Sequence, residues 1–100
     1  MHLLSFRGTK ALSLRAFIIL DMYYTYIIRC TTDGSFYKGH TNNLEDRLKQ
    51  HNSGKSEYTS RNGTWEIFYY EEFNTREDAI KRENYFKSAA GRRFIQKLKT

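Results

Sequence analysis

Two polar side chains interrupt an apolar helical stripe between residues 44 and 51. Leu44, Arg47, Leu48 and His51 recur at i, i+3, i+4 and i+7, which is the spacing of one face of an α-helix. The planar, permanently charged guanidinium of Arg47 suits phosphate oxygens, and the imidazole of His51 one turn later can orient a neighbouring group. A helix that only packed on a sheet would fill this stripe with aliphatic residues, so these polar side chains should either pair with a buried partner or face a cleft.

A carboxylate occupies the same kind of position on a second predicted helix. The inward stripe of that helix reads Ala79, Ile80, Glu83 and Phe86. Burying a carboxylate or a guanidinium without a partner is costly, so Arg47 and Glu83 should either pair or serve a site. Taken singly, each also has a structural explanation. Arg47 could pack its stem beside Leu48, and Glu83 could form an ion pair with Arg47 or Arg82.

The composition favours one compact, basic domain. The chain has 100 residues, 39% of them hydrophobic, with eight Tyr, seven Phe and one Trp, which is enough for one core but too little for two. Its 17 Lys and Arg against 11 Asp and Glu give a formal charge of +6, which favours polyanionic partners such as nucleic acid. Cys30 is the single cysteine, so an internal disulfide or a cysteine zinc cluster is excluded and a cytoplasmic location is expected.

The first 22 residues differ from the rest of the chain. Their apolar patch is split by Arg15 and closed by Asp21, which leaves it far short of the roughly 20 residues of a membrane span. We therefore expect no membrane association. Residues 1–22 are interpreted as an extension, either loosely attached or upstream of a natural start at Met22, and residues 23–100 as the folded domain.

Three strands are predicted. Residues 23–30 are β-branched and aromatic, the Asp-Gly turn within residues 31–35 follows, and "FYKGH" at 36–40 completes a hairpin. The third strand is "TWEIFYYEEF" at 64–73. Its period-2 pattern predicts one common face for Trp65, Ile67, Tyr69 and Phe73.

Three helices complete the predicted elements. Asn42 with Glu45, and Asn74 with Glu77, have the spacing of a capping box at the start of a helix. After "AAG", the tail "RRFIQKLK" predicts a short basic helix. The expected fold is α+β, a three-stranded antiparallel sheet flanked by helices in the order ββαβαα.

Two tripeptides resemble the signature of a known family. "TYI" at residues 25–27 and "YKG" at 37–39 are similar to the paired motifs of the GIY-YIG nuclease domain, particularly of its small single-domain members. Thr25 stands where the first motif has Gly, and Lys38 where the second has an aliphatic residue. The match extends over residues 23–98 because Arg47, His51 and Glu83 follow at positions that resemble the family's arginine, helix-borne histidine and metal-binding glutamate.

The resemblance implies a phosphodiester hydrolase with four catalytic side chains: Tyr26, Tyr37, Arg47 and His51. From chemistry alone either phenol could take the proton of the attacking water, once nearby cations lower its pKa from about 10. The resemblance favours Tyr37 in this role, with Tyr26 hydrogen-bonded close by. It also implies that Glu83 is the sole protein ligand of one divalent ion, Mg²⁺ or alternatively Mn²⁺, which keeps mostly water ligands.

Charge is expected to hold the nucleic acid, with low sequence specificity. The residues proposed to contact it are Lys38, His40, Lys49, Lys55, Arg61, Arg92 and Arg93. The expected substrate is branched, nicked or damaged DNA, in repair or recombination, cut by a monomer or weak dimer that a protein partner targets. The alternatives are a non-catalytic nucleic-acid-binding module of the same fold and a protein-interaction domain.

Overall fold

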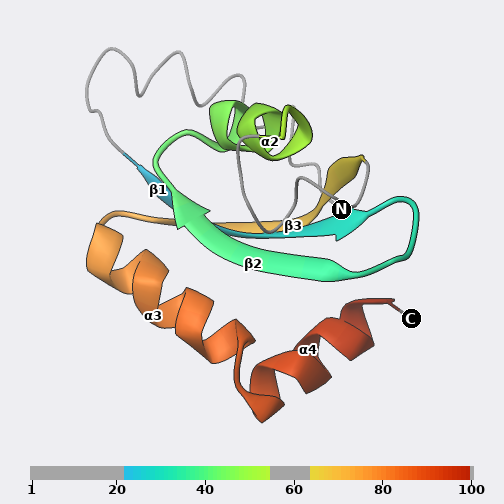
Figure 1. Ribbon diagram of the computed structural model, residues 1–100. Helices are drawn as coiled ribbons and strands as arrows, with labels where there is room; N and C mark the ends of the chain where they lie inside the picture. Colours follow the sequence, from blue (N-terminus) through green and yellow to red (C-terminus); the bar gives the residue numbers. More distant parts are fainter. Residues whose placement is uncertain (1–21, 55–63, 100) are drawn as a thin grey trace.

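The computed structural model describes residues 22–54 and 64–99, and it confirms the α+β fold and the order ββαβαα (Figure 1). The predicted extension at residues 1–22 falls almost wholly outside the described residues, and so do Lys55 and Arg61. The expected boundary between extension and domain therefore stays a prediction. Within the described residues, no helix has the length and apolar character needed to cross a membrane.

The sheet has an edge strand that carries one of the two tripeptides. The strands are β1 (Tyr23–Cys30), β2 (Phe36–Thr41) and β3 (Trp65–Phe73), paired antiparallel in the order β2-β1-β3. Gly34 at φ 77° provides the left-handed residue that the tight β1–β2 turn requires. The register places Tyr26 opposite Gly39, so the middle residue of the first tripeptide lies beside the last residue of the second.

The two faces of the sheet are covered by different helices (Figure 1). Helix α2 (Leu44–Asn52) lies on one face, above a core of Tyr26, Ile28, Cys30 and Trp65 that its two leucines help to cover. Helices α3 (Arg76–Phe86) and α4 (Ala89–Lys99) lie on the other face, around Ile27, Phe86 and Ile95. Successive residues of a strand point to opposite faces of the sheet. Consecutive residues within β1, or within β2, therefore pack in different layers.

The predicted common face of the third strand is wrong beyond Ile67. Trp65 and Ile67 belong to the α2 layer, whereas Tyr69 packs on the other face, with its ring centroid 6.2 Å from that of Phe86. The cause is a register irregularity, since Ile27 pairs with Tyr69 while the next residue of β1 pairs with Ile67. One extra residue in β3 reverses the alternation from there on.

Helix α2 begins one residue later than predicted. Its N-cap is Asn43, not Asn42, and the Asn43 side chain accepts a hydrogen bond of 3.1 Å from the Asp46 amide. The Thr41 hydroxyl accepts from the Asn43 amide at 3.1 Å, which fixes the extended backbone that a cap requires. Glu45 therefore lies in the first turn without completing the predicted capping box.

The other two helices also differ from the prediction at their starts. Thr75, rather than Asn74, caps α3 by accepting from the Asp78 amide at 3.1 Å. Helix α4 includes the "AAG" segment that was expected to precede it. Gly91 is needed inside this helix because a Cβ there would collide with the Tyr85 carbonyl oxygen, so the absent side chain lets α4 turn tightly against α3.

Candidate active site

Tyr26 is the buried centre of a polar cluster on the α2 face. Its hydroxyl lies 2.9 Å from His51 Nε2 and accepts a hydrogen bond of 3.3 Å from Arg47 Nε. The strand supplies the phenol, and the helical spacing of four residues brings Arg47 and His51 to it together. Both Tyr26 and His51 are 1% exposed, so the polar stripe of α2 is packed against the sheet and satisfied there.

The surroundings of this cluster fix its protonation state. Burial raises the pKa of Tyr26 to about 12, against the opposing effect of Arg47. Burial, together with the charge of Arg47, lowers the pKa of His51 to about 4. At neutral pH the phenol therefore keeps its proton and the imidazole is neutral, while the phenol oxygen accepts a hydrogen bond from Arg47. Tyr26 is thus placed to orient other groups rather than to accept a proton.

Tyr37 lies beside the same cluster but nearer to solvent. Its ring centroid is 4.8 Å from that of His51 and 6.4 Å from that of Tyr26. Burial alone would lower the pKa of Arg47, but hydrogen bonds and charge interactions with Tyr26 and Tyr37 outweigh it and raise that pKa. The guanidinium therefore interacts with both phenols. The structure brings together all four side chains that were predicted to be catalytic.

Gly39 creates the space that the Tyr26 hydroxyl occupies. A Cβ at residue 39 would lie 2.6 Å from Tyr26 Oη and 2.8 Å from Cζ. Real side chains do not approach so closely, so any larger residue would push the phenol away from His51 and Arg47. The glycine of the second tripeptide is therefore explained by the position of the tyrosine of the first.

Glu83 forms a second polar cluster, on the α3 face. Its Oε1 lies 2.6 Å from His40 Nδ1, and its Oε2 accepts a hydrogen bond of 2.7 Å from Lys87 Nζ. The suggested ion pair of Glu83 with Arg82 does not form, because Arg82 binds Glu71 at 2.9 Å instead. The suggested ion pair of Glu83 with Arg47 does not form either. His40 holds this carboxylate through Nδ1, and its expected contact with phosphate stays a prediction.

The carboxylate of Glu83 is ionised at neutral pH. Burial would raise its pKa, but the hydrogen bonds from His40 and Lys87 outweigh burial and hold the pKa below its usual range. Because an ionised carboxylate can only accept, His40 Nδ1 must carry the proton that it shares with Oε1. Sequence reasoning missed Lys87. The available signal was its (i, i+4) spacing from Glu83, which favours an ion pair on a helix.

The two clusters are separated by the edge strand rather than merged in one cleft. Gly39 belongs to the tyrosine side of β2 and His40 to the side of Glu83, and β2 has no further neighbour within the described sheet. Glu83 makes its hydrogen bonds to His40 and Lys87, not to either phenol. The two clusters still interact electrostatically. Burial is the main cause of the raised pKa of Tyr26, and the negative charge of Glu83 raises that pKa further.

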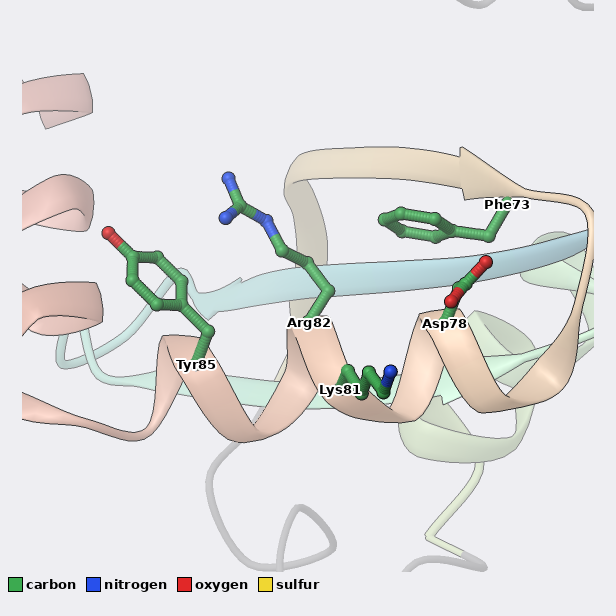
Figure 2. Close-up of a pocket in the computed structure, with 5 residues that line it drawn as sticks. All are labelled: Phe73, Asp78, Lys81, Arg82 and Tyr85. Carbon is green, nitrogen blue, oxygen red and sulfur yellow. The ribbon is translucent and has the colours of Figure 1, made fainter.

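The remaining predicted contacts are spread over the surface. Lys49, Arg92 and Arg93 are exposed, and Lys38 is half-buried on β2. An open hollow lies elsewhere, between the end of β3 and α3 (Figure 2). It is lined by Phe73, Asp78, Lys81, Arg82 and Tyr85. None of the predicted site residues lines it, so this hollow is not the candidate site.

Comparison with protein families identifies the arrangement. The family model described as the GIY-YIG catalytic domain matches residues 22–98. The chain belongs to the GIY-YIG family. This is a nuclease family that acts on DNA and generally uses a divalent metal.

Several GIY-YIG relatives cover most of the chain. A UPF0213 protein of Bacillus licheniformis is 44% identical over 68 residues, which are 67% of this chain and 69% of that protein. A UPF0213 protein of Clostridium perfringens is 41% identical over 76 residues, covering 75% and 81%. The solution NMR structure of a UPF0213 protein from Bacillus halodurans matches with 33% identity and a TM-score of 0.47, over 78% of this chain and 85% of that one.

Glu83 is the side chain that fits the divalent metal of a GIY-YIG nuclease. Within the described residues, no three His, Cys, Asp or Glu side chains gather into a metal-binding group. Mg²⁺ does not need one, because it keeps several waters and binds through one or two carboxylates. An ionised, half-buried carboxylate is a suitable hard oxygen ligand. Lys87 would have to release Oε2, or His40 release Oε1, before that oxygen could bind a cation.

Proposed function

We propose that this chain is a metal-dependent endonuclease that hydrolyses DNA phosphodiester bonds with low sequence specificity, in repair or recombination. The observation that carries the proposal is the hydrogen-bonded group of Tyr26, Arg47 and His51 with Tyr37 beside it. A buried tyrosine needs one partner, whereas this one is held between a cation and a neutral imidazole. Such an arrangement fixes a guanidinium in place for an anion.

Tyr37 is the proposed proton acceptor because it is the less buried phenol and Arg47 lies against it. The water oxygen attacks phosphorus, its proton goes to the Tyr37 oxygen in its phenolate form, and the bond from phosphorus to the 3′-oxygen breaks. The products carry a 5′-phosphate and a 3′-hydroxyl, the latter completed by a proton from solvent. Arg47 balances negative charge on Tyr37 and on the phosphoryl oxygens. Tyr26 and His51 hold the guanidinium in position.

Glu83 would hold the divalent cation, which when bound stabilises negative charge on the departing 3′-oxygen. Its depressed pKa keeps the carboxylate ionised and able to bind a cation at neutral pH. The edge position of β2 supports a shared site, because a DNA strand crossing that edge could meet the tyrosine cluster on one side and Glu83 on the other. Exposed cations, Lys49 and Arg93 among them, would neutralise neighbouring phosphates.

The experiment is a cleavage assay on nicked, flapped and branched DNA with Mg²⁺ or Mn²⁺. The matched variants are Glu83→Gln and Glu66→Gln, since Glu66 is an exposed residue of β3 and its change alters the net charge equally. We expect the wild type and Glu66→Gln to cut, and Glu83→Gln to lose at least about a hundredfold in rate. Equal rates for the two variants, or no cleavage by the wild type on any substrate, would refute the enzyme.

One observation favours the alternative, a non-catalytic nucleic-acid-binding module. Both oxygens of Glu83 are already bonded, to His40 and Lys87, which is the arrangement expected of a structural carboxylate. In that case the wild type and Glu83→Gln would bind the DNA substrates with equal affinity and neither would cut them. DNA binding that is absent even at low salt would instead favour a protein-interaction domain.

A further inference from the structure

Three cations from three different elements lie close enough for their charges to interact, and one of them binds Glu83. Lys38 lies two residues before His40 on β2, and side chains two residues apart on a strand share a face. Lys87 follows the last residue of α3 and donates to Glu83 Oε2 at 2.7 Å. Arg92, in the first turns of α4, donates from Nη1 to the Lys87 carbonyl oxygen at 2.9 Å, which ties its guanidinium to the same corner. These three side chains, Lys38, Lys87 and Arg92, are called the corner cluster.

The positive charges of the corner cluster act on one another. The pKa of Lys38 is lowered, first by burial and then by the charges of Arg92 and Lys87. Within residues 22–54 and 64–99, no carboxylate forms an ion pair with Lys38 or Arg92, and of the three cations only Lys87 pairs with Glu83, whose other oxygen binds His40. Like charges held together without enough counter-charge destabilise a fold. An anion bound among these side chains would relieve the repulsion.

A phosphate has the sign of charge and the acceptor oxygens that suit this corner. Three cations against the one carboxylate of Glu83 leave an excess of two positive charges, of which one phosphodiester neutralises one. The Lys87 ammonium has three donors and uses one of them on Glu83, so two remain for phosphate oxygens. The half-buried stem of Lys38 and the bond that anchors Arg92 restrict both side chains, which reduces the entropy lost on binding.

We propose that Lys38, Lys87 and Arg92 form a subsite for a single backbone phosphate of DNA, next to the phosphate that is cut. This inference rests on the proposed function and adds a location to it. The shared bond between Lys87 and Glu83 places the subsite on the α3 side of the edge strand, whereas Arg47 would hold the scissile phosphate on the α2 side. The bound strand therefore crosses the β2 edge between the two clusters.

The test measures DNA binding by fluorescence anisotropy in EDTA, with a short labelled duplex, across a series of NaCl concentrations. Lys87→Gln is compared with Lys81→Gln, which removes the same charge from an exposed position on α3 that lines the separate hollow (Figure 2). We expect Lys87→Gln to weaken binding about three- to tenfold at low salt and Lys81→Gln to change it less than twofold. Equal effects of the two variants would overturn the subsite.

The salt dependence of DNA binding shows how many phosphates the corner cluster neutralises. The slope of log K against log salt changes by roughly 0.9 for each phosphate that a protein neutralises on duplex DNA. Replacing all three cations of the corner cluster with Gln should therefore flatten the slope by about 0.9 in magnitude, not by about three times as much. If the triple variant unfolds, the double variant Lys38→Gln/Lys87→Gln can replace it, because it keeps the Arg92 side chain and its hydrogen bond. The double variant should flatten the salt slope by no more than the value for one phosphate, about 0.9. A change of two or three phosphates would show separate surface contacts and overturn the proposal.

These outcomes separate the subsite from the enzyme. A wild type that binds and cuts DNA, with Lys87→Gln indistinguishable from Lys81→Gln, removes the subsite and leaves the proposed function standing. A wild type that shows no DNA binding at the lowest salt removes both.

Discussion

Tyr26 and His51 form a buried hydrogen bond of 2.9 Å that joins the central strand to helix α2. Both groups are uncharged at neutral pH, because burial raises the pKa of the phenol and lowers the pKa of the imidazole. Arg47 adds a second bond to the same oxygen at 3.3 Å. The structural and proposed catalytic roles of this cluster therefore depend on the same contact.

The His51 imidazole makes stability pH-dependent in a defined window. Its pKa falls from 6.5 in the unfolded chain to about 4 in the folded protein. A depressed folded pKa means that this contribution is fully present above pH 6.5 and is lost as pH falls towards 4. The loss is on the order of 3 kcal/mol. Urea unfolding between pH 7 and pH 4 should show the decline for the wild type.

His51→Gln provides the control for this pH dependence. The amide cannot titrate, so the unfolding free energy of the variant should be lower at pH 7 but should change less between pH 6.5 and pH 4. Glu83 also has a lowered pKa and contributes at the acid end in both proteins. A variant with the same slope as the wild type across this window would show that His51 is not held neutral.

Replacing each of the two tyrosines with phenylalanine should affect stability and activity to different degrees. Tyr26→Phe removes the partner of buried His51 and should cost about 1–3 kcal/mol of unfolding free energy. Tyr37→Phe removes a half-buried hydroxyl and should cost less, yet it should abolish cleavage because it removes the proposed proton acceptor. Denaturant unfolding and single-turnover cleavage measure the two effects. Retained cleavage by Tyr37→Phe would transfer the role of proton acceptor to another group.

Gly39→Ala should disturb the cluster without altering any of its polar groups. The added Cβ would lie 2.6 Å from Tyr26 Oη, so the phenol has to move away from His51 and Arg47. We expect a loss of about 1–3 kcal/mol in unfolding free energy. Cleavage should fall by at least tenfold. A stable and fully active alanine variant would mean that the Tyr26 position does not matter for the site.

The architecture could be read from the sequence because local and long-range signals agree. Aromatic and β-branched residues around an Asp-Gly turn predicted the hairpin, and the strands match at residues 23–30 and 36–41 to within one residue. The irregularity in β3 was not predictable, because one inserted residue leaves the local composition unchanged. Both cap positions were misplaced since two side chains capable of capping stand next to each other at each helix start.

The candidate site was only partly predictable, for a different reason. The stripe of α2 located Arg47 and His51, because helical periodicity is a local signal. The pairing of His40 with Glu83 joins residues 43 apart in sequence, and the chain pattern carries no information about it. The separation of Glu83 from the phenols by the edge strand follows from the same long-range geometry. Only the fold shows which residues share a face.

The most direct test of the account is a crystal structure of Tyr37→Phe with uncleaved branched DNA and Mn²⁺, read by anomalous scattering. The account predicts an Mn²⁺ peak at Glu83 and a phosphate that contacts both this ion and the Arg47 guanidinium across the β2 edge. An Mn²⁺ peak away from Glu83, or DNA that contacts only one of the two clusters, would contradict it.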